Sequence, residues 1–301
     1  MNQSIPNILL AVDGSERAQA TVNYVAHTLR PQAARLTLFS VLETVPASFW
    51  DLERNSDLAP RLKGVKAWAA QRSQEMDAFM HKAQRLLHKA GHPAELISVK
   101  VAERHAGVAS DILAEAQGPY HTVIFGRRGL GAFRGLVLGS VAIKLINSLS
   151  ERPVWVVGKG AKPPRLLLAL DGSPNSLRAV EYTAGLCAGQ PLYLTLLHVV
   201  RDARQQAVLR RGETLTAVEK MLERSRQRLL QAGFGPRQVR VQTLHHAASR
   251  GGAIVELARK GGYGTIVMGR KGVTEAKEFP LGRVSQKVLQ MARGLAVWLI
   301  P

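Results

Sequence analysis

The segment that decides the fold runs from Gly126 to Ser140 and reads GRRGLGAFRGLVLGS. It follows a short apolar run, residues 121–125, that is typical of a buried strand, and it leads into residues 141–149, which have helical character. A glycine-rich loop therefore joins a strand end to a helix start. Helix starts present unpaired N–H groups and a partial positive charge, and glycine lets the backbone approach an anion closely. The segment predicts a phosphate-binding loop, to which the Ser140 hydroxyl adds a donor.

Two familiar phosphate-binding motifs do not fit this loop. A P-loop requires a lysine before its Ser or Thr, whereas Gly139 precedes Ser140, and the glycine spacing of the dinucleotide fingerprint fails by one position. What remains is Gly126-x-x-Gly129, nine residues, and then Gly139-Ser140. By spacing alone, a plain surface loop is an equally good interpretation. The context of the loop favours phosphate.

The loop belongs to one of two repeated units. Residues 166–173 (LLLALDGS) repeat 8–15 (ILLAVDGS), residues 265–272 (TIVMGRKG) repeat 122–129 (TVIFGRRG), and residues 296–300 (AVWLI) repeat 153–157 (PVWVV). The first offset is 158 and the other two are 143, because the second copy is shorter between its second and third strands. A repeat with both ends aligned predicts a tandem duplication. The linker 158–164 (GKGAKPP) then separates a domain of residues 1–158 from one of residues 163–301.

Strands and helices are predicted to alternate within each unit. In the first unit the predicted strands are 8–12, 36–42, 96–101, 122–125 and 153–157. Helices are predicted after Ser15, after the polar stretch 44–60, from Val108 and from Ser140. The strands lack polar alternation, which indicates a parallel sheet covered by helices on both faces.

Composition limits the class of protein. The chain has 301 residues, of which 46% are hydrophobic, enough for two domains with real cores. No run of about 18 apolar residues exists and the start lacks a secretory pattern, so we expect a soluble cytoplasmic protein. Cys187, the single cysteine, is expected in the core. Lys and Arg outnumber Asp and Glu by 18 to 13 in residues 1–158 and by 23 to 9 in residues 159–301, so the basic charge lies mainly in the second half.

These motifs and their spacings resemble the universal stress protein family, in its tandem two-domain form. The resemblance implies α/β domains of flavodoxin or Rossmann-like type, each with a five-stranded parallel sheet in the order 3-2-1-4-5 and helices on both faces. It also implies a stress-response regulatory protein that binds an adenine nucleotide, ATP with or without Mg²⁺. The ligand would sit at the carboxyl ends of strands one and four, where the strand order reverses.

The resemblance assigns the site residues by position. Asp13 would contact the adenosine end of the nucleotide, although an Asx-turn or helix-cap role is the alternative. Arg127 and Arg128 are candidates for neutralising phosphate, or are solvated surface side chains. The remaining assignments are Ala11, Val12 and Val41 around the base, Gly126, Gly129, Gly139 and Ser140 around the phosphates, and Val141 at the helix start.

The second unit carries an altered version of the same site. Its corresponding residues are Asp171, Val199, Gly269, Gly272, Gly282 and Arg283. Arg283 replaces Ser140, and the nine-residue insert 273–281 contains two glutamates that would oppose an anion. We therefore expect the first unit to bind nucleotide better.

No catalytic or metal-binding constellation stands out in the sequence. His105, His245 and His246 lack metal-ligand spacing with a carboxylate, so we expect a regulatory binding protein, with slow ATP hydrolysis as an alternative. The resemblance implies pairing through the fifth strands, which contain Trp155 and Trp298, as an internal pseudo-dimer or also between chains.

A polyanion-binding surface, for nucleic acid or an anionic membrane, is a further alternative for the second half. Residues 201–233 carry eight Lys and Arg against four Asp and Glu. The same stretch lacks aromatic residues for base stacking. Its apolar positions follow helical spacing, which favours a solvated helix face instead. Those positions are Val208, Leu215, Val218, Leu222 and Leu229.

Overall fold

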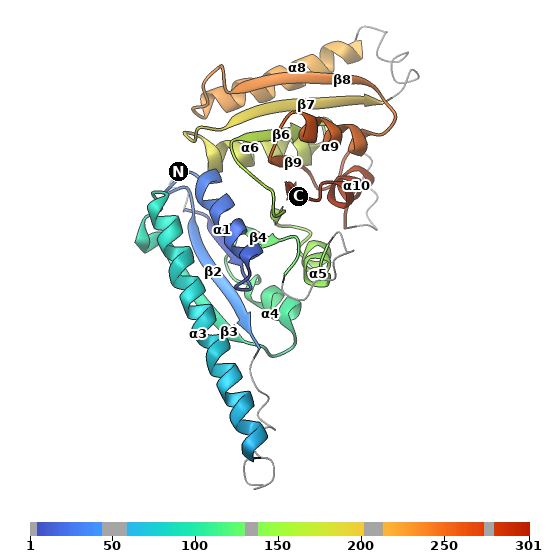
Figure 1. The fold of residues 1–301 in the computed structure, drawn as a ribbon. Coiled ribbons are helices and arrows are strands. Elements are labelled where there is room, and N and C mark those ends of the chain that lie inside the picture. The colour runs from blue at the N-terminus through green and yellow to red at the C-terminus, as the bar shows by residue number, and fades with distance from the viewer. Residues whose placement is uncertain (1–4, 44–58, 130–137, 202–212, 274–279) are drawn as a thin grey trace.

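The computed structural model describes the chain apart from residues 1–4, 44–58, 130–137, 202–212 and 274–279. Strands and helices alternate along it, as the sequence predicts (Figure 1). The first half contains β1 (Asn7–Ala11), α1 (Glu16–Thr28), β2 (Arg35–Leu42), α3 (Ala59–Lys89), the short 3-10 helix η2 (Ala94–Leu96), β3 (Ile97–Glu103), α4 (Val108–Glu115), β4 (Thr122–Gly126), α5 (Ser140–Ser148) and β5 (Val154–Val157). The second half contains β6 (Arg165–Ala169), α6 (Pro174–Cys187), β7 (Tyr193–Arg201), α8 (Glu213–Gln231), β8 (Val239–Ala247), α9 (Arg250–Lys260), β9 (Thr265–Gly269), α10 (Arg283–Met291) and β10 (Ala296–Ile300).

The first helix of each half begins after an equivalent serine, and the first of these starts was predicted from the sequence. The Ser15 hydroxyl accepts a hydrogen bond from the Ala18 N–H at 3.1 Å, and the Ser173 hydroxyl accepts one from the Ser176 N–H at 3.2 Å. Each serine therefore caps its helix, α1 or α6, and satisfies an amide that has no partner within the helix. The predicted cap at Ser15 is confirmed.

The strands form one ten-stranded sheet in the order β3-β2-β1-β4-β5-β10-β9-β6-β7-β8. Each half has the predicted order 3-2-1-4-5 and is parallel within itself. The halves are joined by antiparallel pairing of β5 with β10, in which Trp155 lies opposite Trp298. The sheet is therefore mixed and continuous, and pairing through the fifth strands is confirmed.

A hydrophobic core lies on each face of this sheet. One core includes apolar side chains of α1, α3, α6 and α8, and the other includes side chains of α4, α5, α9 and α10. Both cores contain residues of β5 and β10, so each continues from one half into the other. Cys187 is fully buried in the first of them, as expected.

The two tryptophans stack at the centre of the junction. The ring centroids of Trp155 and Trp298 are 3.7 Å apart and their planes differ by 6°. Tyr24 of α1 and Tyr182 of α6 approach Trp155 edge-on at centroid distances of 6.3 Å. All four side chains lie at equivalent positions of the repeat, because Tyr24 maps onto Tyr182 and Trp155 onto Trp298.

Buried hydrogen bonds cross the junction in both directions. The Tyr24 hydroxyl lies 2.6 Å from the Thr265 hydroxyl and accepts a bond of 3.0 Å from the Trp298 indole N–H, both in the second half. The Tyr182 hydroxyl lies 2.7 Å from the hydroxyl of Thr122 in the first half. Burial raises the pKa of Tyr24 well above its ordinary range, which keeps this phenol protonated and able to donate. The junction is thus both apolar and specifically hydrogen-bonded.

We predict that Trp155→Ala destabilises the full chain by about 3–5 kcal/mol, because it removes a completely buried ring and leaves a cavity at the junction. Equilibrium urea unfolding measures this loss, and small-angle scattering reports whether the halves stay docked. Trp68→Ala is the matched control, since that indole on α3 is 46% exposed and its removal should change stability by no more than about 0.5 kcal/mol. Equal losses for the two variants would show that the stacked pair does not hold the halves together.

Candidate functional site

The candidate site lies at the carboxyl ends of β1 and β4. These strands are neighbours, with Ala11 opposite Phe125, and β1 pairs with β2 on its other side. The order of strands along the chain reverses between β1 and β4, so the loops after them diverge to opposite faces of the sheet. Ligands of open α/β sheets bind in the crevice at such a point. The chain places Asp13 after β1 and the glycine loop after β4, so both lie at this crevice.

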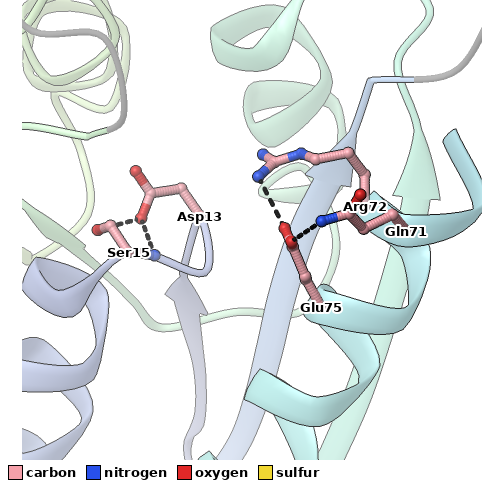
Figure 2. A network of polar contacts seen from close by, with 5 residues as sticks. All are labelled: Asp13, Ser15, Gln71, Arg72 and Glu75. Carbon is pink, nitrogen blue, oxygen red and sulfur yellow. Dashed lines mark hydrogen bonds and ion pairs between the residues drawn. The ribbon is translucent and has the colours of Figure 1, made fainter. Parts of the chain in front are cut away.

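The Asp13 carboxylate has one oxygen engaged in the turn that follows β1. Its Oδ1 accepts hydrogen bonds from the Ser15 backbone N–H at 3.1 Å and from the Ser15 hydroxyl at 2.6 Å (Figure 2). Gly14 between them has φ of 77°, a left-handed conformation that glycine adopts readily. The Asx-turn role that the sequence left open is therefore present, and it fixes the orientation of the carboxylate.

The second carboxylate oxygen faces the glycine loop. A Cβ atom built on Gly129 would lie 2.6 Å from Asp13 Oδ2, closer than real Cβ atoms come to another heavy atom. The carbonyl of Gly129 also receives a hydrogen bond of 3.4 Å from the Arg17 guanidinium. The structure therefore brings Asp13 and Gly129 together although 116 positions separate them in the chain. Only a glycine leaves the carboxylate in this position.

The far end of the loop leads into α5. Gly139 is the N-cap residue, and its N–H donates to the Arg127 carbonyl at 3.0 Å, which closes the loop on itself. No side chain of the described residues caps this helix, and Ser140 is exposed at its start. The first-turn amides of α5 are thus oriented as an anion-binding site requires. Residues 130–137, in the middle of the loop, lie outside the described part of the chain.

The remaining predicted residues fall into two groups. Ala11 and Val12 are buried, whereas Val41, at the end of β2, Gly126 and Val141 are half-buried around the crevice. Ala11, Val12 and Val41 could form an apolar wall for the base. Gly126 and Val141 could contact a ligand through their backbone.

Arg127 differs from both interpretations that the sequence offered. Its side chain is only 3% exposed, and its guanidinium donates to the carbonyl of Leu289, in α10 of the second half, at 2.5 Å. Burial, with a smaller contribution from Arg128, lowers the pKa of Arg127 to about 10. The side chain is engaged at the junction and is not solvated. Arg128, in contrast, is half-buried and stays a candidate for phosphate.

The second half contains a similar but more open arrangement. A Cβ on Gly272 would lie 2.5 Å from Asp171 Oδ2, and Asp171 Oδ1 accepts from the Ser173 N–H at 3.0 Å. Gly282 is the N-cap of α10, and Arg283 is exposed at its start.

Four features separate the second half from the first. Asp171 is exposed whereas Asp13 is half-buried. Asn175 replaces Arg17 and is hydrogen-bonded to Arg178. Gly269 is tightly enclosed, since its Cβ would come within 2.9 Å of the Ser176 backbone nitrogen, and Val199 is buried. Both glutamates of the insert, Glu275 and Glu278, lie outside the described residues.

The structure adds neighbours that the sequence did not identify. Figure 2 shows Gln71, Arg72 and Glu75 of α3 on the side of Asp13 away from Ser15, and both Gln71 and Arg72 donate to the Glu75 carboxylate, at 2.9 and 3.4 Å. Met76 of the same helix lies 3.4 Å from the Cβ position of Gly14. Helical periodicity placed α3 in the core, but it could not indicate which turn of a 31-residue helix would lie beside β1.

Among the described residues, no group of three or more His, Cys, Asp or Glu residues could hold a metal ion, and no helix is long and apolar enough to cross a bilayer. His105, His245 and His246 are exposed. In α8, Leu222 and Leu229 are buried and Val218 packs against the core, so the described part of its apolar stripe faces inward as predicted. Val208 and the side chain of Leu215 lie outside the described part of the chain.

Comparison with known proteins identifies relatives of both halves. The sequence model of the universal stress protein family matches residues 5–158 and 164–294. A universal stress protein of Mycolicibacterium smegmatis is 27% identical over 199 residues, which cover 65% of this chain and 64% of that protein. A universal stress protein of Bacillus subtilis is 28% identical over 142 residues, 42% of this chain and 93% of that protein. The chain thus spans slightly under two thirds of the length of the mycobacterial relative.

Solved structures confirm the fold over the whole chain. A universal stress protein from Archaeoglobus fulgidus superimposes with a TM-score of 0.62 at 19% identity, covering 99% of both chains. A putative universal stress protein from Pseudomonas aeruginosa gives a TM-score of 0.57 at 17% identity, covering 99% of this chain and 93% of that one. At these identities the likeness shows the fold alone.

We predict that Gly129→Ala destabilises the protein by about 1 kcal/mol in the absence of any ligand, because the new Cβ displaces the Asp13 carboxylate and weakens its bonds to Ser15. Gly294→Ala, in the turn before β10, is the control, since its Cβ would meet no atom within 4 Å and its backbone lies outside the left-handed region. Urea unfolding of both variants measures the difference. Unchanged stability of Gly129→Ala would mean that the carboxylate does not rest against the loop.

Proposed function

Because the chain belongs to the universal stress protein family in its tandem two-domain form, we propose that its first half binds an adenine nucleotide, with ATP as the expected ligand. We further propose that the bound nucleotide changes the affinity of the chain for a protein partner. The observation that carries the proposal is the contact between the Asp13 carboxylate and the Gly129 backbone at the strand-order reversal.

The adenosine end of the ligand is assigned to Asp13 and the apolar wall beside it. A carboxylate accepts hydrogen bonds from ribose hydroxyls or from a base N–H, and a bond to a charged acceptor is stronger than one between neutral groups. The turn to Ser15 fixes the orientation of this carboxylate. Ala11, Val12 and Val41 supply the neighbouring apolar surface.

The phosphate end is assigned to the start of α5. The first-turn amides and the exposed Ser140 hydroxyl supply donors, and the helix dipole favours a negative charge there. Gly129 and Gly139 leave the backbone uncovered on the approach to these donors. Mg²⁺ would enter with the phosphates, since it is usually held by phosphate oxygens, water and one or two carboxylates.

The second half is the weaker candidate. It retains the contact between Asp171 and Gly272, so the difference lies in the rest of the site. Arg283 replaces the small hydroxyl of Ser140, and the more exposed Asp171 offers less shielding from water, which weakens hydrogen bonds to a ligand. We propose that this half contributes mainly to the assembly of the chain.

The proposed link from the nucleotide to the rest of the chain begins at β5, which is buried between β4 and β10. Gly126 pairs with Val157 at the end of β5, and the Arg127 N–H donates to the Val157 carbonyl at 2.8 Å. The start of the glycine loop is therefore bonded directly to the strand at the junction of the halves. A nucleotide that binds one arrangement of this connection more tightly than another would shift the chain toward that arrangement and so change its affinity for a partner.

The test is a titration of the full chain with a fluorescent ATP analogue, with Asp13→Asn and Asp171→Asn as matched variants. Both substitutions keep the size of the side chain and an acceptor for the turn but remove the charge. Asp13→Asn should weaken binding by about tenfold, because a hydrogen bond to a charged group contributes about 1.5 kcal/mol or more. Asp171→Asn should leave the tightest binding unchanged. A larger loss in Asp171→Asn would move the site to the second half, and no binding by the parent chain would end the proposal.

A further inference from the structure

Two buried arginines cross between the halves at equivalent positions of the repeat. Arg270, in the segment that follows β9, is 1% exposed, and its guanidinium donates to the carbonyls of Leu149, at 3.0 Å, and of Ile146, both at the carboxyl end of α5. Its Nε donates to the Pro280 carbonyl at 2.8 Å. Arg127 makes the reciprocal contact with Leu289 at the carboxyl end of α10. The offset of 143 maps Arg127 onto Arg270 and Ile146 onto Leu289, so the contacts are related by the duplication.

Each arginine therefore belongs to the glycine loop of one half and donates hydrogen bonds to the carboxyl end of a helix in the other half. The last carbonyls of a helix have no partner within it, and a cation is stabilising at that negative end of the helix dipole. Arg270 meets both needs for α5, which has nine residues. Such a helix is about 13 Å long at a rise of 1.5 Å per residue, so fixing its carboxyl end also limits the movement of its start.

The start of α5 is the phosphate end of the proposed nucleotide site. Resting on that proposed function, we propose that Arg270, a residue of the second half, is a positioning residue for the nucleotide site of the first half. It holds the carboxyl end of α5 and thereby sets where the first-turn amides and Ser140 meet the phosphates. The second half then has a defined task even without a ligand of its own.

Because the Arg270 guanidinium is buried and charged, it requires hydrogen-bond acceptors in place of water. Its carbonyl partners replace the water that a guanidinium loses on burial, and leaving a buried charge without partners is strongly unfavourable. A displacement of α5 would therefore break hydrogen bonds of the buried Arg270 guanidinium, which is energetically unfavourable. The position of α5 is tied to the second half more firmly than by apolar contacts alone.

The experiment compares ATP with adenosine on the full chain by isothermal titration calorimetry. Arg270→Met keeps an unbranched side chain and removes the charge and its donors. Since adenosine lacks phosphates, its affinity should stay within about twofold of the parent chain, whereas ATP affinity should fall about five- to tenfold. A generally loosened fold would weaken both ligands alike, so the ratio of the two affinities identifies positioning.

Arg259→Met is the matched control. Arg259 donates to the Met291 carbonyl at 2.5 Å and so caps the carboxyl end of α10 from within the second half. Its loss should leave the ratio of ATP to adenosine affinity unchanged. An equal change of that ratio in both variants would overturn the inference.

Arg270→Lys keeps the charge with fewer donors and should give an intermediate loss of ATP affinity. If Arg270→Met does not fold, Arg270→Lys replaces it as the test variant. ATP binding by Arg270→Lys as tight as that of the parent chain would then overturn the inference. If the parent chain binds ATP and Arg270→Met binds it equally well, positioning fails while the proposed function stands. If the parent chain binds neither ligand, the proposed function fails and the inference fails with it.

Discussion

The antiparallel pairing of β5 with β10 is the constraint on which the rest of the structure depends. It places Trp155 against Trp298 with parallel rings 3.7 Å apart and turns two five-stranded units into one sheet. Both strands would otherwise be exposed edges of entirely apolar sequence, which invite pairing with other chains. Each half therefore pairs the exposed backbone groups of the other half's edge strand. The hydrophobic cores on both faces continue across the junction.

This constraint extends to the candidate site. The glycine loop of the first half begins with Arg127, whose backbone is bonded to the end of β5 and whose side chain is bonded to α10. The helix that ends the loop, α5, is held at its other end by Arg270. Both ends of the proposed phosphate cradle thus reach the junction. A duplicated chain has the advantage that the two units are always present in equal number and at high effective concentration.

Much of the fold could be predicted from residue patterns. The repeated LDGS and VDGS strand ends, the buried strands and the linker were sufficient to predict two units of alternating strands and helices, whereas the strand order was implied by the resemblance to the universal stress protein family. The contact of Asp13 with Gly129 agrees with the sequence-based expectation that both residues meet at the reversal of strand order. The N-cap at Ser15 could be predicted from the sequence because capping depends on neighbours within three positions.

The rest depends on contacts between residues far apart in the chain. Arg127 and Arg128 are adjacent and chemically identical, yet only Arg127 is buried, because the carbonyl of Leu289 lies in reach of its side chain. No local pattern contains that information, since 162 positions separate the partners. The same holds for Arg72 and Glu75, which came to lie across from Asp13 through the register of α3 on the sheet.

The most direct test of the account is a crystal structure of the full chain with a non-hydrolysable ATP analogue. We predict density for the nucleotide in the first half, with its ribose or base at Asp13 and its phosphates at the start of α5. Arg270 should remain bonded to the carbonyls of α5 in that complex. Nucleotide bound only at Asp171 and α10, or away from both strand-order reversals, would contradict it.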